Sequence, residues 1–137
     1  MKIFFDTNVL VSAFTSRQGL CFKLFAEVIR TPFLGFVTGE VVITELERVL
    51  TRQSKVSTQD IQELLHLLRQ EEIIRLPTDP KTVFVRDPDD ALVLASALSA
   101  NADVLVTGDD DLLVLGNTAG VKIMNPRALW ELLTGEK

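Results

Sequence analysis

Four carboxylates follow four apolar runs of this chain, and such runs are typical of buried strands. The runs span residues 3–5, 33–37, 73–76 and 104–107. The acids that follow them are Asp6, Glu45, Asp90 and Asp109. In a parallel α/β sheet every strand points the same way, so the four acids are expected at one edge of the sheet. Clustered carboxylates repel one another unless a cation neutralises them, which makes a hard divalent metal site the first hypothesis.

A shared metal requires that the strands ending near Asp6 and Asp109 be neighbours. This occurs when they flank the point where the strand order reverses, the crevice where open α/β sheets bind ligands. Carboxylates there suit Mg²⁺ or Mn²⁺, because both prefer oxygen ligands and retain waters for a phosphate-bearing substrate. The chain has one Cys and one His, so no Cys/His cluster favours zinc.

Each acid also has a structural explanation. Asp6 could end a strand at a turn, and the run Asp109–Asp111 could be a solvated turn with a helix cap. Asp87, Asp89 and Asp90 all complement the positive end of a helix dipole. The ligand within this last run therefore stays open on local grounds.

Periodicity does not identify the acid in the segment around residue 45. A helical wheel of about 100° per residue places Glu45 at one margin of the apolar stripe and Glu47 at the other. Glu40 is a third candidate.

Strand-like and helix-like segments alternate along the chain. The predicted strands are 2–5, 33–37, 73–76, 104–107 and 121–124, with Thr38-Gly39 ending the second. Helices are predicted over residues 20–29, 42–52 and 91–100, the last of these after a helix start at Asp87-Pro88. A further helix, capped by Ser57 or Thr58, is predicted to reach Leu68, and a final helix is predicted after a cap at Asn125. This order predicts one α/β domain over residues 1–137, a three-layer α/β/α sandwich with a mainly parallel sheet of about five strands. The apolar helix 91–100 is expected to be buried between the sheet and a partner chain.

Composition narrows the setting and the chemistry. The net charge is −5, which disfavours a general nucleic-acid coat, although bound metal would add positive charge locally. A single cysteine fits a reducing compartment, and no apolar run approaches the ~20 residues of a membrane span. The N-terminus lacks the features of a signal peptide, so we expect the cytosol. Phosphate-loop and dinucleotide-binding motifs are absent, as is a pair of histidines for acid–base catalysis.

Four segments of the chain, in order, resemble the successive motifs of the PIN domain family. They are D-T-N-V-L-V-S-A-F at 6–14, T-E-L-E-R-V-L at 44–50, R-D-P-D-D-A-L at 86–92 and L-V-T-G-D-D-D-L at 105–112. The resemblance covers nearly the whole chain and is greatest to VapC-like prokaryotic PIN proteins, the toxins of toxin–antitoxin pairs.

This resemblance implies a Mg²⁺- or Mn²⁺-dependent endoribonuclease that cleaves RNA. The family's acids match Asp6, Glu45, Asp90 and Asp109, which would hold the metal and carry catalysis, with Asp111 as a less constant ligand. Asn8 and Thr107 match polar residues that support the site. The resemblance also implies an antitoxin protein as partner and a homodimer.

Two other functions stay open at this stage. The first is a haloacid-dehalogenase-like phosphatase, in which Asp6 would be a covalent nucleophile and the run at Asp109 would hold Mg²⁺. That family expects a second Asp two places after the nucleophile, where this chain has Asn8. The second is a PIN-like module that binds RNA or a protein without cutting.

Overall fold

A five-stranded parallel sheet forms the centre of the molecule, with strand order β3-β2-β1-β4-β5. The structure is a computed structural model that describes residues 1–53, 55–74 and 88–135. Its strands are β1 Lys2–Phe5, β2 Gly35–Gly39, β3 Glu72–Ile74, β4 Val104–Val106 and β5 Lys122–Met124. Its helices are α1 Thr7–Thr15, α2 Leu20–Arg30, α3 Glu40–Gln53, α4 Thr58–Arg69, α5 Pro88–Ser99, α6 Asp110–Leu113 and α7 Pro126–Thr134.

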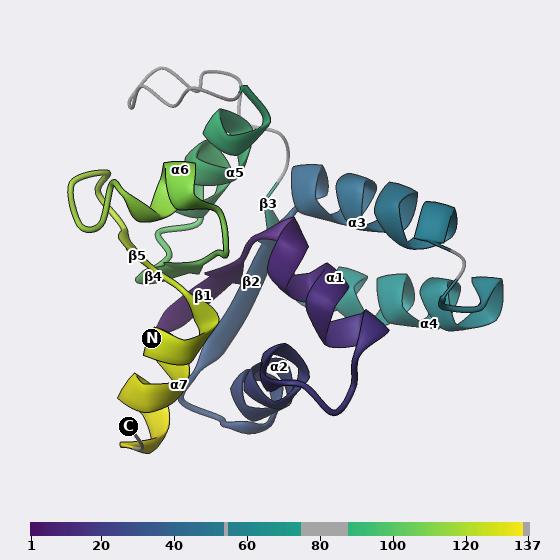
Figure 1. Cartoon of the computed structure of the whole chain (residues 1–137). Coiled ribbons are helices and arrows are strands. Elements are labelled where there is room, and N and C mark those ends of the chain that lie inside the picture. The colour runs from purple at the N-terminus through teal and green to yellow at the C-terminus, as the bar shows by residue number, and fades with distance from the viewer. Residues whose placement is uncertain (54, 75–87, 136–137) are drawn as a thin grey trace.

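Helices cover both faces of this sheet, so the predicted three-layer α/β/α sandwich is confirmed. Figure 1 shows α1 to α4 on one side of the sheet and α5 on the other, while α7 packs against α2. Strand β2 contacts α2 and α3 as well as α5, so helices pack on both of its faces. No described helix has the length and apolarity needed to cross a membrane.

Strand β1 lies in the middle of the sheet, paired with β2 on one side and β4 on the other. Its residues Ile3, Phe4 and Phe5 are fully buried, which explains the continuous apolar run that begins the sequence. The order reverses between β1 and β4, as the shared-metal hypothesis required. The carboxyl ends of these two strands therefore open into the crevice where such sheets bind ligands.

Helix α1 was not predicted, and β2 begins two residues later than predicted. Helix α1 is short and buries Val9, Leu10 and Ala13, a stripe too brief to stand out in a window of ordinary helix length. In β2, pairing with β1 sets Gly35 opposite Lys2 and leaves Phe33 exposed. The expectation that Thr38-Gly39 would end the strand was wrong, because the strand continues through both residues directly into α3.

Other boundaries lie close to the predicted ones. Ser57 caps α4 by accepting a hydrogen bond from the Asp60 N–H at 3.1 Å, and Asn125 caps α7 by accepting one from the Ala128 N–H at 2.8 Å. Helix α5 begins at Pro88 and buries its middle, as expected. The predicted cap at Asp87 and the predicted strand end at 75–76 lie outside the described residues.

Candidate metal centre

Asp6 is held at the junction of β1 and α1 by hydrogen bonds to both of its carboxylate oxygens. Its Oδ1 accepts from the Thr7 N–H at 2.7 Å, so that Asp6 is the N-cap of α1. Its Oδ2 accepts from the Thr107 hydroxyl at 2.7 Å. The side chain is 6% exposed, which is unusual for a carboxylate. Asp6 thus has a structural role as a cap and a fixed, buried position at the switch point of the sheet.

Thr107 links the carboxyl ends of β1 and β4. Its hydroxyl donates to Asp6 and accepts from the Asp109 N–H at 3.0 Å. Asp109 in turn caps α6, accepting at Oδ1 from the Asp111 N–H at 2.9 Å. Asn8 makes a further link, because its Oδ1 accepts from the Gly108 N–H at 3.3 Å.

Burial raises the pKa of Asp6 above its ordinary value of 3.8. The hydrogen bonds from Thr107 and Thr7 oppose this increase, because they stabilise the ionised form, and the negative charge of Asp109 adds to it. The protein alone therefore disfavours the charge on Asp6. A cation nearby would remove that penalty, since an opposite charge favours the ionised carboxylate.

The fold distinguishes the three glutamates of α3. Glu45 lines the same cavity as Asp6. Glu47 is exposed on the side of α4, where its Oε2 accepts a hydrogen bond from Gln62 at 3.5 Å. Glu40 forms an ion pair with Arg69 at 3.1 Å. Only the way α3 packs on its neighbours turns Glu45 to the acids of the sheet edge, which a helical wheel could not decide.

Two acids of the first turn of α5 reach the same cavity. Asp90 is 9% exposed, while Asp89 is exposed at the mouth. Asp89 had been considered only as an alternative to Asp90, and the structure places both there, together with Val93, whose side chain had not been considered. Asp87, the third acid of this run, lies outside the described residues.

These side chains surround a cavity of about 190 Å³ lined by Asp6, Asn8, Glu45, Asp89, Asp90, Val93 and Asp109. Carboxylate oxygens of Asp90, Asp109 and Asp111 lie within 4.8 Å of one another. Asp90 and Asp109 thus belong both to the cavity wall and to this closer group. Asp6 and Glu45 line the cavity but are not members of the closer group.

The acidic lining offers only oxygen ligands, which fits Mg²⁺ or Mn²⁺ and not a soft metal. The single His does not take part. His66 is exposed on α4, with its ring within 3.0 Å of the Gln70 side-chain nitrogen. It lines a different cavity, together with Glu47 and Arg69. A histidine general base at the acidic cavity is therefore ruled out within one chain.

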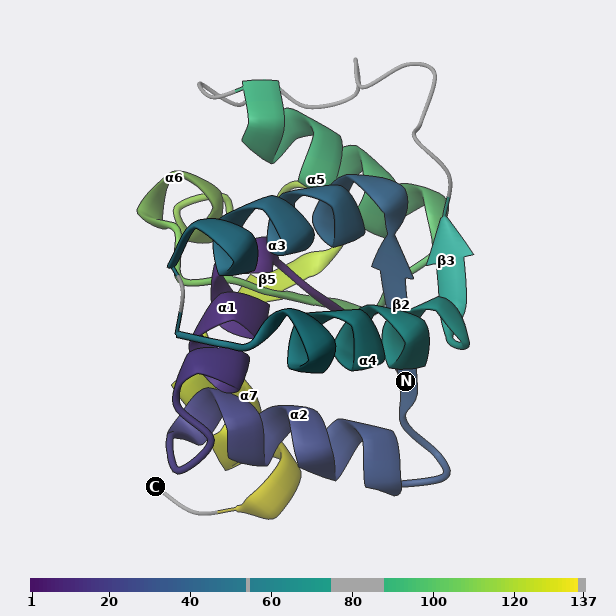
Figure 2. The same cartoon turned by 90° about the vertical axis from the view of Figure 1, so that its right-hand side faces the viewer.

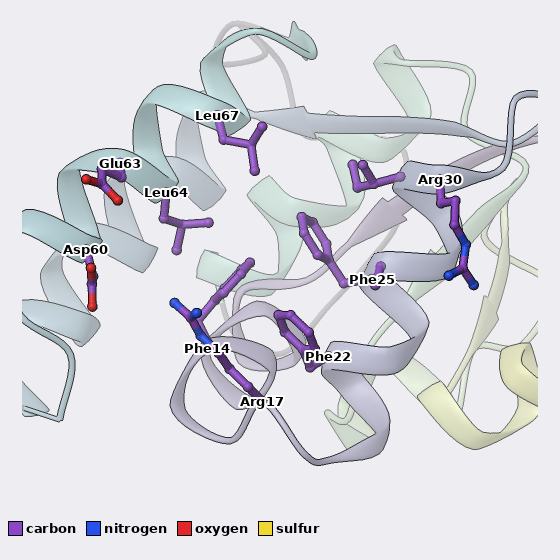
Figure 3. Close-up of a pocket in the computed structure, with 11 residues that line it drawn as sticks. Phe14, Arg17, Phe22, Phe25, Arg30, Asp60, Glu63, Leu64 and Leu67 are labelled. Atoms are coloured by element: carbon purple, nitrogen blue, oxygen red, sulfur yellow. The ribbon is translucent and has the colours of Figure 1, made fainter.

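A larger, apolar groove of about 510 Å³ lies on another part of the molecule, between α1, α2 and α4 (Figure 3). Phe14, Phe22 and Phe25 form its floor, with ring centroids of Phe14 and Phe25 5.1 Å apart. Its other lining residues are Arg17, Ala26, Ile29, Arg30, Asp60, Glu63, Leu64 and Leu67. This groove has the character of a protein-binding surface and not of a phosphate site, because its lining is mainly apolar.

Comparison with known proteins identifies a family whose model matches this chain and several solved structures with a similar fold. Residues 2–111 match the model of the family described as "PIN domain". No protein with curated annotation matches the sequence.

Among solved structures, the chain is similar to VapBC2 from Rickettsia felis, bound to a DNA fragment from its promoter, with a TM-score of 0.64 and 19% identity over 91% of this chain and 98% of the other. It is also similar to VapBC-1 from nontypeable Haemophilus influenzae, with a TM-score of 0.64 and 17% identity over 93% of this chain and 99% of the other. The similarity to Mycobacterium tuberculosis VapC20, a toxin that cleaves the sarcin–ricin loop, has a TM-score of 0.61 and 17% identity over 83% of this chain and 95% of the other. At these sequence identities the comparison shows a common fold and nothing beyond it.

Proposed function

Since the chain belongs to the PIN domain family, we propose that it is a Mg²⁺- or Mn²⁺-dependent endoribonuclease. Asp6, Glu45, Asp90 and Asp109 hold the metal and carry catalysis, with Asp111 as a further ligand. The observation that supports this most is the cavity itself, where acids from the β1–α1 junction, α3, α5 and the β4–α6 junction meet. Carboxylates brought together from four separate segments are costly without a cation, so their joint placement favours a metal site.

A metal held by Asp6, Glu45, Asp90 and Asp109 would lower the pKa of a water and would stabilise charge on the phosphodiester oxygens. The protein supplies positions for the reacting groups. Thr107 fixes the Asp6 carboxylate and the Asp109 backbone in one orientation through its two hydrogen bonds. Asn8 holds the loop at Gly108 against α1. Glu45 or Asp90 would orient the attacking water by accepting a hydrogen bond from it, so a side-chain base of neutral pKa would not be needed.

The phosphatase hypothesis is not retained, because the family match is to the PIN domain. A direct test is incubation of the purified protein with a generic single-stranded RNA in Mn²⁺, in Mg²⁺ and in excess EDTA. We expect cleavage with either metal and none with EDTA. RNA binding without cleavage under all conditions would instead favour the non-cleaving PIN-like module.

We also propose an antitoxin protein as partner, with the apolar groove of Figure 3 as its binding surface. Two of the similar structures described above are VapBC assemblies, and a further similar structure is a toxin–antitoxin complex from Klebsiella pneumoniae. In this chain the groove has Arg17 on one wall and Asp60 and Glu63 on the other, as Figure 3 shows. It therefore suits an amphipathic helix with an apolar stripe, acidic residues along one margin and basic residues along the other.

The product of the adjacent gene is the natural probe for this partner. Leu67→Asp, in the groove, should abolish co-purification with it, while Leu132→Asp on α7 should not. Both leucines are exposed, at 41% and 55%, so we expect the fold to tolerate either change. Equal co-purification of the two variants would contradict this use of the groove. We propose further that residues 1–137 form a single domain and that the protein acts in the cytoplasm as a homodimer. Light scattering of the purified protein tests the dimer.

A further inference from the structure

A second cavity adjoins the acidic one and is not used by the mechanism above. It measures about 370 Å³ and is lined by Val41, Thr44, Glu45, Arg48 and Asp89. Glu45 and Asp89 line both cavities, so the two cavities adjoin at these residues. Helices α3 and α5, which carry these residues, lie side by side (Figure 2).

One face of α3 forms most of this cavity. Positions 41, 44, 45 and 48 are spaced by three and four residues, so they lie in one stripe along the helix. The stripe presents an aliphatic surface at Val41, a hydroxyl at Thr44 and a guanidinium at Arg48. Each of these groups suits one part of a nucleotide: the aliphatic surface suits the base or the ribose face, the hydroxyl suits the sugar oxygens, and the guanidinium suits the phosphate.

Arg48 differs from two other arginines of the chain. Arg30 is paired with Glu27 and Arg69 with Glu40. Arg48 is exposed, and within residues 1–53, 55–74 and 88–135 it forms no hydrogen bond or ion pair. A guanidinium held beside a cavity of carboxylates, yet bonded to none of them, is available for an anionic ligand.

We propose that this second cavity is a nucleotide subsite, in which Arg48 binds the phosphate next to the bond that is cleaved. This inference rests on the proposed ribonuclease function. An RNA strand that enters a cluster of carboxylates is repelled by them, and a net charge of −5 gives it no general attraction to the protein. A cation at the rim, one turn of helix from Glu45, offsets this repulsion where the strand leaves the metal centre.

The test compares Arg48→Ala and Arg48→Lys with Lys23→Ala as control. Lys23→Ala removes one exposed positive charge from α2, which leads to the start of β2, at the opposite edge of the sheet from the acids. Cleavage kinetics on a labelled single-stranded RNA give kcat and KM in Mn²⁺. Fluorescence anisotropy of the same RNA, with each change placed in an Asp6→Asn background, measures binding without cleavage.

We expect Arg48→Ala to raise KM and the anisotropy Kd about tenfold and to change kcat less than about twofold. The slope of log Kd against log salt should fall by about 0.7, the value for one phosphate contact on a single strand. Arg48→Lys should recover part of the binding, and Lys23→Ala should match the unchanged protein.

Two results would overturn the subsite. One is equal binding by the Arg48→Ala and Lys23→Ala proteins, and the other is a loss confined to kcat, which would mean that Arg48 positions the acids. If the unchanged protein binds RNA without cutting it, the nuclease proposal fails, while weaker binding by Arg48→Ala still supports the subsite. If the unchanged protein neither binds nor cuts, both proposals fail.

Discussion

Replacing Asp6 by Asn should have opposite effects on stability in the absence and in the presence of metal. Asn is as good an N-cap as Asp, so its Oδ1 can keep the bond from the Thr7 N–H. Its Nδ2 can then donate to the Thr107 hydroxyl, which accepts from Asp109 as well. The substitution therefore retains the packing at this junction and removes mainly one buried charge and one metal ligand.

The magnitude follows from the pKa of Asp6, which burial raises above 3.8. The folded protein binds more protons than the unfolded chain between 3.8 and the raised value, so the free energy of unfolding falls as pH rises through that window. Each unit of such a shift is worth about 1.36 kcal/mol. Without metal at pH 7, Asp6→Asn should therefore unfold at a higher temperature than the unchanged protein, by roughly 3–5 °C for each kcal/mol regained. Below pH 3.8 the gain should vanish.

With metal the order should reverse. A cation that binds only the folded state adds about 2.7 kcal/mol when its free concentration is about 100 times Kd. The unchanged protein should receive this increase from Mn²⁺, while Asp6→Asn, with a neutral amide in place of a ligand, should not. Thermal unfolding in EDTA and in Mn²⁺, at pH 7 and below pH 3.8, measures both effects. The control is Glu63→Gln, which changes an exposed side chain on α4. The reasoning is refuted if Asp6→Asn and the unchanged protein melt together in EDTA at pH 7 and gain equally from Mn²⁺.

Three further outcomes follow from the same geometry. Glu45→Gln should reduce the cleavage rate at saturating Mn²⁺ by about 100-fold or more, and Glu47→Gln by less than about twofold, because only Glu45 lines the acidic cavity; equal losses would contradict this. Thr107→Val should lower the free energy of unfolding in urea by about 1–3 kcal/mol, since it removes both hydrogen bonds of a fully buried hydroxyl; an unchanged transition midpoint would show that these bonds are replaced. RNA products should carry a 5′-phosphate and a 3′-hydroxyl, because water attacks phosphorus and the 3′-oxygen leaves; a 2′,3′-cyclic phosphate in mass spectrometry, or cleavage in excess EDTA, would rule out the metal–water mechanism.

The sequence alone was sufficient to predict the architecture. Apolar runs of strand length that alternate with amphipathic segments permit few arrangements other than a parallel sheet between helices. The same regularity predicted that Asp6 and Asp109 would lie at one edge of the sheet, since parallel strands end at the same edge. A shared metal also required their strands to be neighbours, and the strand order shows that they are. Local signals such as the Asn125 cap were also readable, because a cap depends only on residues a few positions apart.

Other features depend on contacts between distant segments, and the tertiary structure alone decided them. The rotation of α3, set by its packing on α1, α4 and α5, places Glu45 at the acidic cavity and Glu47 outside it, although both flank one stripe. The bond from Thr107 to Asp6 joins residues 101 positions apart. The burial of Asp6, which raises its pKa, likewise depends on segments that are distant in the sequence and pack around it. Periodicity reports which side of a helix is apolar, but the orientation of its polar margins is decided by what packs against it.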